Sequence, residues 1–172
     1  MNDADRRSRN TARLAECWPP FAAAVIRIIA QLEGVGFRPR VQDGYRTPAA
    51  QLEAFRSGHS KLKYGFHNVT RADGTPESLA VDLIDDDHPL ASPAGYCVAV
   101  AAFAGAEGCQ TGLRWGVPSA MQGPIDRALA ARDWSGLGVK MGWDPTHIEP
   151  VGITPAEAKA GRRPDHLQGG TP

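Results

Sequence analysis

The chain has 172 residues, and its 19 Lys and Arg balance 19 Asp and Glu. At roughly 100 to 200 residues per domain, this length predicts one domain, 1–172, that can bury a sizeable core without disulfides. With zero net charge, the protein has no overall positive electrostatic field that would attract a polyanion, so we expect no nucleic-acid partner. The cysteines Cys17, Cys97 and Cys109 are far apart and lack a Cys-x-x-Cys spacing, which predicts small buried thiols instead of a disulfide framework or a thiolate zinc site.

No apolar stretch reaches the length of about 18 to 20 residues that crossing a membrane takes. The stretch from Tyr96 to Ala106 contains Gly105 and falls well short. The polar N-terminus carries the pair Arg6 and Arg7, but no apolar segment follows directly, so we expect no signal peptide. We therefore expect a protein that is synthesised in the cytoplasm without a membrane anchor. Separately, we expect it to be a monomer.

Apolar periodicity, together with helix start and stop residues, predicts the secondary structure in chain order. Pro19 and Pro20 separate a polar first helix from an apolar second helix, and Thr47 followed by Pro48 is typical of a helix start. Helices before, between and after short strands indicate an α+β domain. The expected helices cover 3–17, 21–32, 48–56, 93–104 and 124–132, and the expected strands cover 40–45, 79–84, 113–115 and 146–149.

Two segments are expected to lack regular structure. Residues 58–78 are rich in Gly, Ser, Asn and Asp, and irregular segments of this length are uncommon in compact domains and often functional. The Gly- and Pro-containing tail after Gly161 is expected to fray. We therefore assign the core to about 14–150, with the N-terminal helix and the C-terminal tail peripheral to it.

One carboxylate stands out in the strand predicted at 79–84. Because side chains alternate along a strand, Asp82 lies on one face of the strand and Val81 and Leu83 lie on the other. The face of Asp82 also carries apolar residues. A buried carboxylate costs free energy unless it is paired, hydrogen-bonded or bound to a metal. A structural salt bridge to an arginine and a ligand role both remain open at this point.

Two histidines can join this carboxylate. His67 lies upstream of the strand in an aromatic, glycine-bearing segment, and His147 begins the last strand, three residues after Asp144. Two neutral imidazoles and one carboxylate can hold Zn²⁺ and leave a fourth position for water, whose pKa the metal lowers to about 7. Asp144 is then a candidate to accept a proton from that water. Taken alone, each histidine is more often a structural or surface residue.

The order of four segments, QDGYRTPAAQ, SGHSKLKYGFH, SLAVDLID and GWDPTHIEP, resembles one zinc peptidase family. That family contains the D-alanyl-D-alanine peptidases of vancomycin resistance and the L-alanyl-D-glutamate peptidases of bacteriophage endolysins. The resemblance spans about 14–150. It implies an α+β fold of the D,D-peptidase and Hedgehog type, with a small antiparallel sheet flanked by helices.

The resemblance also implies the composition of the metal site. His67, Asp82 and His147 match the positions that bind Zn²⁺ in the family. Asp144 matches the catalytic acid/base, a position that Glu or Asp fills.

Further positions of the resemblance lie outside the metal site. Arg46 matches an arginine that steadies the carbonyl oxygen of the scissile bond, where a fixed guanidinium stabilises developing negative charge. Gln51 and the pair Ser60 and Lys61 match supporting or substrate-binding positions. Ordinary helix and loop surface is the alternative interpretation of these three residues.

Two features depart from the family pattern. Residues 68–78, between two proposed ligands, form a longer spacer than usual and include the turn signature Asp-Gly-Thr-Pro at 73–76. Gly65 stands two positions before His67, where a serine is common. The longer spacer costs little closure entropy, and we expect it to shape the cleft or to act as a flap.

We expect a zinc-dependent hydrolase of peptidoglycan stem peptides that acts on the cell wall after release or export. The preferred activity is that of an L-alanyl-D-glutamate endopeptidase, with a D,D- or L,D-carboxypeptidase as the alternative within the family. Two interpretations come from other classes. One is a non-catalytic zinc domain that binds cell wall or a partner, and the other is an iron oxygenase with a facial triad.

Overall fold

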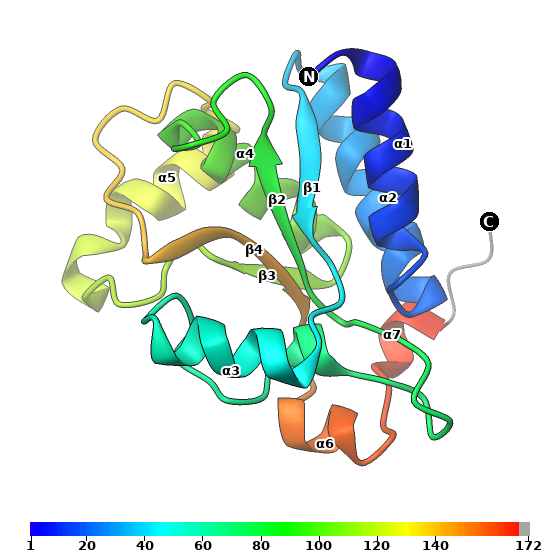
Figure 1. Cartoon of the computed structure of the whole chain (residues 1–172). Coiled ribbons are helices and arrows are strands. Elements are labelled where there is room, and N and C mark those ends of the chain that lie inside the picture. The colour runs from blue at the N-terminus through cyan, green and yellow to red at the C-terminus, as the bar shows by residue number, and fades with distance from the viewer. Residues whose placement is uncertain (169–172) are drawn as a thin grey trace.

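A four-stranded antiparallel sheet with the strand order β1-β2-β4-β3 forms the centre of the structure. A computed structural model describes residues 1–168 (Figure 1). The strands are β1 (Pro39–Asp43), β2 (Val81–Asp85), β3 (Cys109–Gly112) and β4 (Asp144–Pro150). The helices are α1 (Asp3–Leu14), α2 (Pro19–Gly34), α3 (Pro48–Arg56), α4 (Ala94–Ala106), α5 (Gly123–Ala131), α6 (Pro155–Lys159) and α7 (Asp165–Gln168), with 3-10 turns η1 (Phe66–Asn68) and η2 (Ser119–Met121).

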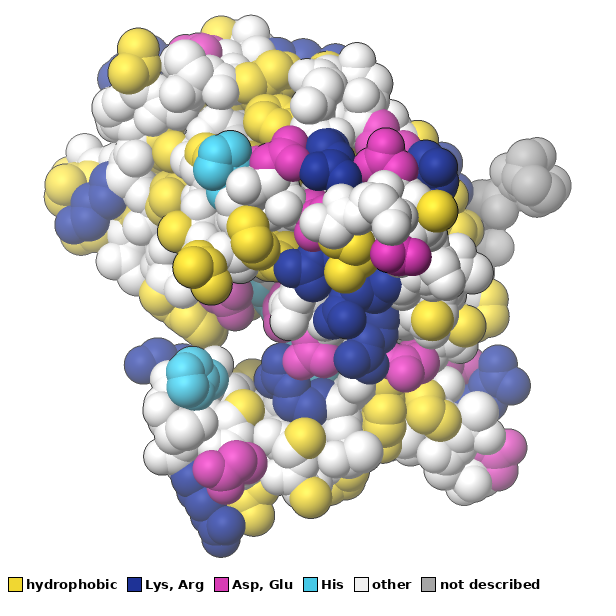
Figure 2. All heavy atoms as spheres, turned by 45° about the horizontal axis from the view of Figure 1, so that its top comes forward, with side chains coloured by type: hydrophobic (Ala, Val, Ile, Leu, Met, Phe, Trp, Pro, Cys, Tyr) yellow, Lys and Arg dark blue, Asp and Glu magenta, His cyan; other side chains and the backbone are white. Residues whose placement is uncertain are grey.

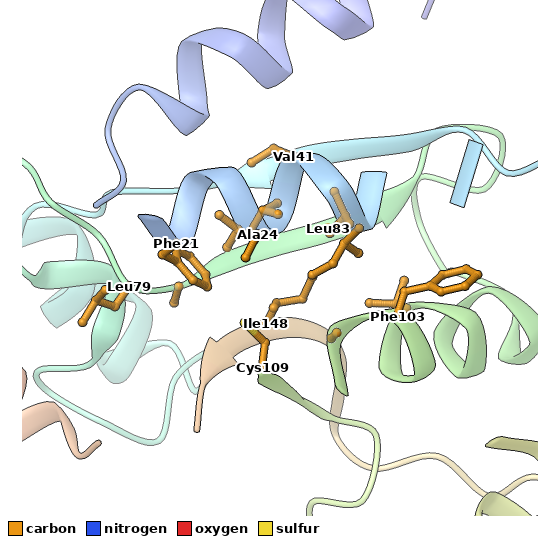
Figure 3. Close-up of a cluster of buried hydrophobic side chains, with 14 of the residues drawn as sticks. Phe21, Ala24, Val41, Leu79, Leu83, Phe103, Cys109 and Ile148 are labelled. Atoms are coloured by element: carbon orange, nitrogen blue, oxygen red, sulfur yellow. The ribbon is translucent and has the colours of Figure 1, made fainter. Parts of the chain in front are cut away.

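The apolar core lies between the sheet and two helices, α2 and α4. The stripe predicted in the second helix is buried, since Phe21, Val25 and Ile28 are each 0% exposed. Figure 3 shows Phe21 of α2 and Phe103 of α4 in one cluster with strand residues such as Ile148. Alternation along the strands sends these apolar side chains to one face and leaves the other face free for polar groups.

The predicted α+β class and the small antiparallel sheet flanked by helices are both confirmed. The predicted start of α3 is also confirmed, because the Thr47 side chain accepts a hydrogen bond from the amide of Ala50 at 3.2 Å and Pro48 occupies the first turn. The three cysteines are buried free thiols, as predicted, and burial raises the pKa of each to about 12. In the described part of the chain, no helix combines the length and apolarity needed to cross a membrane.

Three predictions about local structure are wrong. The first helix ends at Leu14 instead of residue 17, and Cys17 forms an isolated β-bridge with Ser78. The third strand covers Cys109–Gly112 instead of 113–115, because the chain turns at Trp115, whose amide donates to Gly112 O at 3.0 Å. The tail does not fray directly after Gly161. Helix α7 packs beside α2, and its residue Leu167 is 8% exposed. The remainder of the tail prediction concerns positions outside the described residues.

Leu83 and Leu90 provide a matched test of the core. Leu83 is 0% exposed and Leu90 is 99% exposed. Leu83→Ala is expected to lower the free energy of unfolding by about 3 kcal/mol, because it removes buried methyl groups and leaves a cavity. Leu90→Ala should change it by less than about 0.5 kcal/mol. Urea unfolding of both variants measures the difference, and similar losses would contradict the placement of Leu83 in the core.

Candidate metal centre and its cleft

Cross-strand pairing sets two of the candidate ligands side by side. Asp82 of β2 lies directly opposite His147 of β4 in the register of the sheet. Their neighbours Val81 and Ile148 form the preceding cross-strand pair and are each 0% exposed in the core. Since side chains alternate along a strand, Asp82 and His147 point away from the core into a cleft.

The third candidate ligand, His67, is placed by a loop whose backbone is tied to Arg46. The amide of Arg46 donates to His67 O at 2.8 Å, and Asn68 Nδ2 donates to Arg46 O at 2.6 Å. His67 Nδ1 lies 2.6 Å from Gly44 O. Because a carbonyl only accepts, Nδ1 is the donor, and the lone pair of Nε2 is left to face the cleft.

The three donor atoms lie close to the spacing of one face of a tetrahedral site, with one distance about 0.2 Å shorter than ideal. His67 Nε2 lies 3.3 Å from His147 Nδ1 and 3.4 Å from Asp82 Oδ1, and His147 Nδ1 lies 3.1 Å from Asp82 Oδ1. Zinc–ligand distances of about 2.0 to 2.2 Å correspond to tetrahedral edges of roughly 3.3 to 3.6 Å. No fourth His, Cys, Asp or Glu joins this cluster within the described residues. The donor set fits Zn²⁺ with one position left open.

The charges of the site also suit a divalent cation. His147 Nε2 lies 3.1 Å from Glu149 Oε2. When both imidazoles are neutral, the carboxylates of Asp82 and Glu149 give this group of side chains two negative charges. Burial acts to lower the pKa of His147, but hydrogen bonds to Asp82 and Glu149 outweigh it and raise the pKa to about 10. Burial acts to raise the pKa of Asp82, yet His67 and His147 hold that pKa well below its usual range. Positive charge is therefore favoured on His147 between the two carboxylates, and a metal ion beside Asp82 would compete with the proton on His147 Nδ1.

The Arg46 guanidinium is held in a fixed orientation beside the candidate metal ligands. Its Nε and Nη2 donate to Asp43 Oδ2 at 2.9 and 2.6 Å, and its Nη1 donates to Gln51 Oε1 at 3.0 Å. Nη2 also lies 3.4 Å from Asp82 Oδ2. The sequence analysis did not single out Asp43. It is the cross-strand partner of Asp82, so the register of β1 and β2 is enough to place it next to the site.

Asp144 reaches the same cleft through an irregularity in the sheet. It lies three residues before His147, and strict alternation would place the two side chains on opposite faces. The β3–β4 register shifts between Thr111 and Gly112, which pair with Ile148 and Asp144. Asp144 consequently lines the cleft with His147. Burial and the charge of Asp82 raise the pKa of Asp144, which suits a group that accepts and returns a proton.

The cleft has a volume of about 820 Å³, within the range of roughly 300 to 1,000 Å³ typical of ligand sites. Figure 2 shows the surface hollowed between the lower part of the molecule, which carries α3, and the rest. The lining comprises Arg46, Gln51, 58–62, 65–67, Asp82, Trp115, Trp143, Asp144, His147, Glu149 and 153–155. The sequence analysis missed the segment 153–155. Thr154 and Pro155 begin a helix as Thr47 and Pro48 do, but such a helix start does not indicate a place in the cleft.

The predicted substrate-side residues Gln51 and Ser60 line the cleft, but the chain itself occupies their polar groups. Gln51 is 2% exposed, and its Nε2 donates to Ser60 Oγ at 2.8 Å and to Leu62 O at 2.6 Å. Ser60 Oγ also donates to Leu62 O at 3.1 Å. The side-chain oxygen of Gln51 accepts a hydrogen bond from Arg46, and its nitrogen donates to the loop at 58–62. Gln51 therefore connects the guanidinium to this loop.

The long spacer between His67 and Asp82 forms a turn away from the cleft. The predicted turn is present, since the amide of Thr75 donates to Asp73 Oδ1 at 2.9 Å. Glu77 anchors the segment through ion pairs with Arg71 and Arg163. None of the residues 69–78 lines the cleft, so the expectation that the spacer shapes the cleft or covers it is not supported.

Comparisons with known proteins give few matches. No family model matches the chain, and no curated protein matches it in sequence. Among solved structures, the chain is similar to the L-Ala D-Glu endopeptidase ChiX of Serratia marcescens at 20% sequence identity and a TM-score of 0.47. The match covers 87% of this chain and 94% of the ChiX chain.

Metal binding at the three donors can be tested with two histidine variants. His67→Ala is expected to weaken zinc binding more than about 100-fold. Loss of a residue that only hydrogen-bonds to a metal ligand costs about 10- to 100-fold, and loss of a ligand itself should cost more. His88, which contacts Asp85 outside the cleft, provides the control, and His88→Ala should keep the affinity of the unmodified chain. Zinc titration against a competing chelator measures both, and undiminished affinity in His67→Ala would place the metal elsewhere.

Proposed function

We propose that the chain is a zinc-dependent peptidase that hydrolyses stem peptides of bacterial peptidoglycan, as an L-alanyl-D-glutamate endopeptidase. One observation carries the proposal. Three donor atoms of His67, Asp82 and His147 lie 3.1 to 3.4 Å apart on one wall of a cleft that also contains Asp144 and Arg46. The substrate class rests on the sequence, because the four segments that carry these residues resemble the peptidoglycan peptidases.

In the proposed hydrolysis the chain would hold the metal ion, transfer a proton through Asp144 and stabilise negative charge through Arg46. When bound, Zn²⁺ would lower the pKa of a water molecule to about 7 and polarise the scissile carbonyl. Asp144 accepts a proton as the water oxygen bonds to the carbonyl carbon, and it returns that proton to the nitrogen as the C–N bond breaks. The Arg46 guanidinium, fixed by Asp43 and Gln51, stabilises negative charge on the carbonyl oxygen.

A non-catalytic zinc domain is the main alternative from another class. Structural zinc sites are normally closed by four protein ligands. Among the described residues, only three candidate ligands face the cleft, and a structural site would not need a carboxylate such as Asp144 beside them. An iron oxygenase with a facial triad requires two histidines and a carboxylate as well, but the resemblance in sequence favours hydrolysis.

Digestion of purified sacculi tests the reaction and the bond that is cut. Zinc-loaded protein should release peptides that begin with D-Glu and leave L-Ala on the glycan, and a chelator should stop the release. Loss of a terminal D-Ala alone would instead identify the alternative, a D,D- or L,D-carboxypeptidase. Zinc binding without any change in fragment masses would support a non-catalytic domain.

Replacement of Asp144 separates proton transfer from metal binding. Asp144→Asn is expected to lower kcat about 10²- to 10⁴-fold, the usual contribution of a general acid/base, while the zinc content stays at that of the unmodified chain. Asp126, an exposed residue outside the cleft, is the control, and Asp126→Asn should keep full activity. Full hydrolysis by a zinc-loaded Asp144→Asn protein would exclude the proposed role.

Replacement of Arg46 tests the stabilisation of the carbonyl oxygen. Arg46→Lys keeps the charge but loses the planar fork that binds Asp43 and Gln51, so kcat should fall about 10²-fold. Arg56→Lys, at the exposed end of α3, provides a matched control that should leave kcat unchanged. Equal kcat values for the two variants, measured on the same muropeptide, would contradict the role of Arg46.

A further inference from the structure

Two tryptophans form an aromatic surface on the wall of the cleft, next to the proposed metal ligands. The ring centroids of Trp115 and Trp143 lie 5.0 Å apart, and the Trp115 ring lies 5.4 Å from that of His147. Trp143 is 50% exposed although it is large and apolar. The third tryptophan of this region, Trp134, packs against Phe103 at 5.5 Å instead. The pair of Trp115 and Trp143 is therefore a feature of the cleft that the proposed hydrolysis does not use.

The backbone holds this tryptophan pair in place. The amide of Trp143 donates to Trp115 O at 3.2 Å, and the amide of Gly142 donates to Leu113 O at 2.7 Å. A Cβ on Gly142 would lie 2.1 Å from Gly112 O and 2.6 Å from the amide nitrogen of Trp115, so only glycine allows the two segments to approach this closely. The exposed indole is thus presented by a fixed framework, which limits the entropy lost when a ligand packs against it.

The chemistry of the pair favours a ligand with an apolar face and polar edges. An indole offers a broad flat apolar surface together with one N–H donor. A pyranose ring matches this surface, because its axial C–H groups form an apolar face while its hydroxyl groups point outward at the rim.

The position of the pair matches the sugar of one particular substrate. In peptidoglycan, the L-Ala carbonyl is separated from the muramyl ring by one alanyl residue and a lactyl group, about 7 Å of extended chain. Two ring-to-ring steps of 5.4 and 5.0 Å lead from His147 to Trp143. A D-Ala-D-Ala bond lies three residues farther along the stem, about 10 Å more when the stem is extended, which would put the sugar beyond the pair.

We propose that Trp115 and Trp143 bind the muramyl sugar ring of the substrate, so that the enzyme prefers stem peptides still attached to the glycan strand. This inference rests on the proposed function and specifies its substrate. It assigns Trp143 as a residue that determines substrate specificity.

Two substrates with the same tetrapeptide test the proposal. One is a disaccharide muropeptide, and the other carries an N-acetyl group in place of the muramyl-lactyl unit. The unmodified enzyme should show kcat/KM about tenfold higher for the muropeptide, a factor that corresponds to about 1.4 kcal/mol. Trp143→Ala should bring the ratio of the two kcat/KM values close to one, and Trp143→Phe should keep part of the preference. Leu62→Ala is the control, because Leu62 is 51% exposed in the same cleft, and it should not change the ratio.

The outcomes separate this proposal from the proposed function. Hydrolysis of both substrates with equal kcat/KM, or a Trp143→Ala variant that loses activity equally on both, would overturn the sugar site and leave the peptidase intact. Binding of muramyl-L-alanine is measured independently by saturation-transfer NMR on zinc-loaded protein. Binding that Trp143→Ala abolishes, in a protein that cleaves neither substrate, would support the sugar site and reject the peptidase.

Discussion

The pairing of β2 with β4 is the constraint on which the rest of the site depends. It places Asp82 opposite His147, and the same register buries Val81 against Ile148. A slip of one residue would turn every side chain of the strand to the other face, which would send Asp82 into the apolar core. The free energy of core burial, roughly 2 kcal/mol or more for each large aliphatic side chain, therefore also fixes the geometry of two proposed ligands.

The loop that carries His67 is attached to this pair through the backbone around Arg46. The amide and carbonyl of Arg46 hold the loop that carries His67, while its side chain contacts Asp43 and Gln51 and lies near Asp82. A proposed metal ligand and a proposed oxyanion-stabilising group thus share one anchor. A proposed site with three protein ligands has no fourth protein ligand to make it rigid, so this anchor would help it to keep its shape.

The sequence predicts those parts of the site that follow from local rules. Alternation in a single strand was enough to mark Asp82, and Thr47 with Pro48 marked the start of α3. The common orientation of Asp144 and His147 was beyond local rules, because it depends on the register shift between Thr111 and Gly112. The hydrogen bonds of Gln51 within the chain, and the position of the two tryptophans in the cleft, likewise depend on tertiary contacts.

Anomalous scattering at the zinc edge, from crystals of the zinc-loaded protein, tests the central claim most directly. One zinc ion should lie about 2.0 to 2.2 Å from His67 Nε2, Asp82 Oδ1 and His147 Nδ1, and no protein atom should fill its fourth position. A zinc ion bound elsewhere, or one closed off by a fourth protein side chain, would contradict the account.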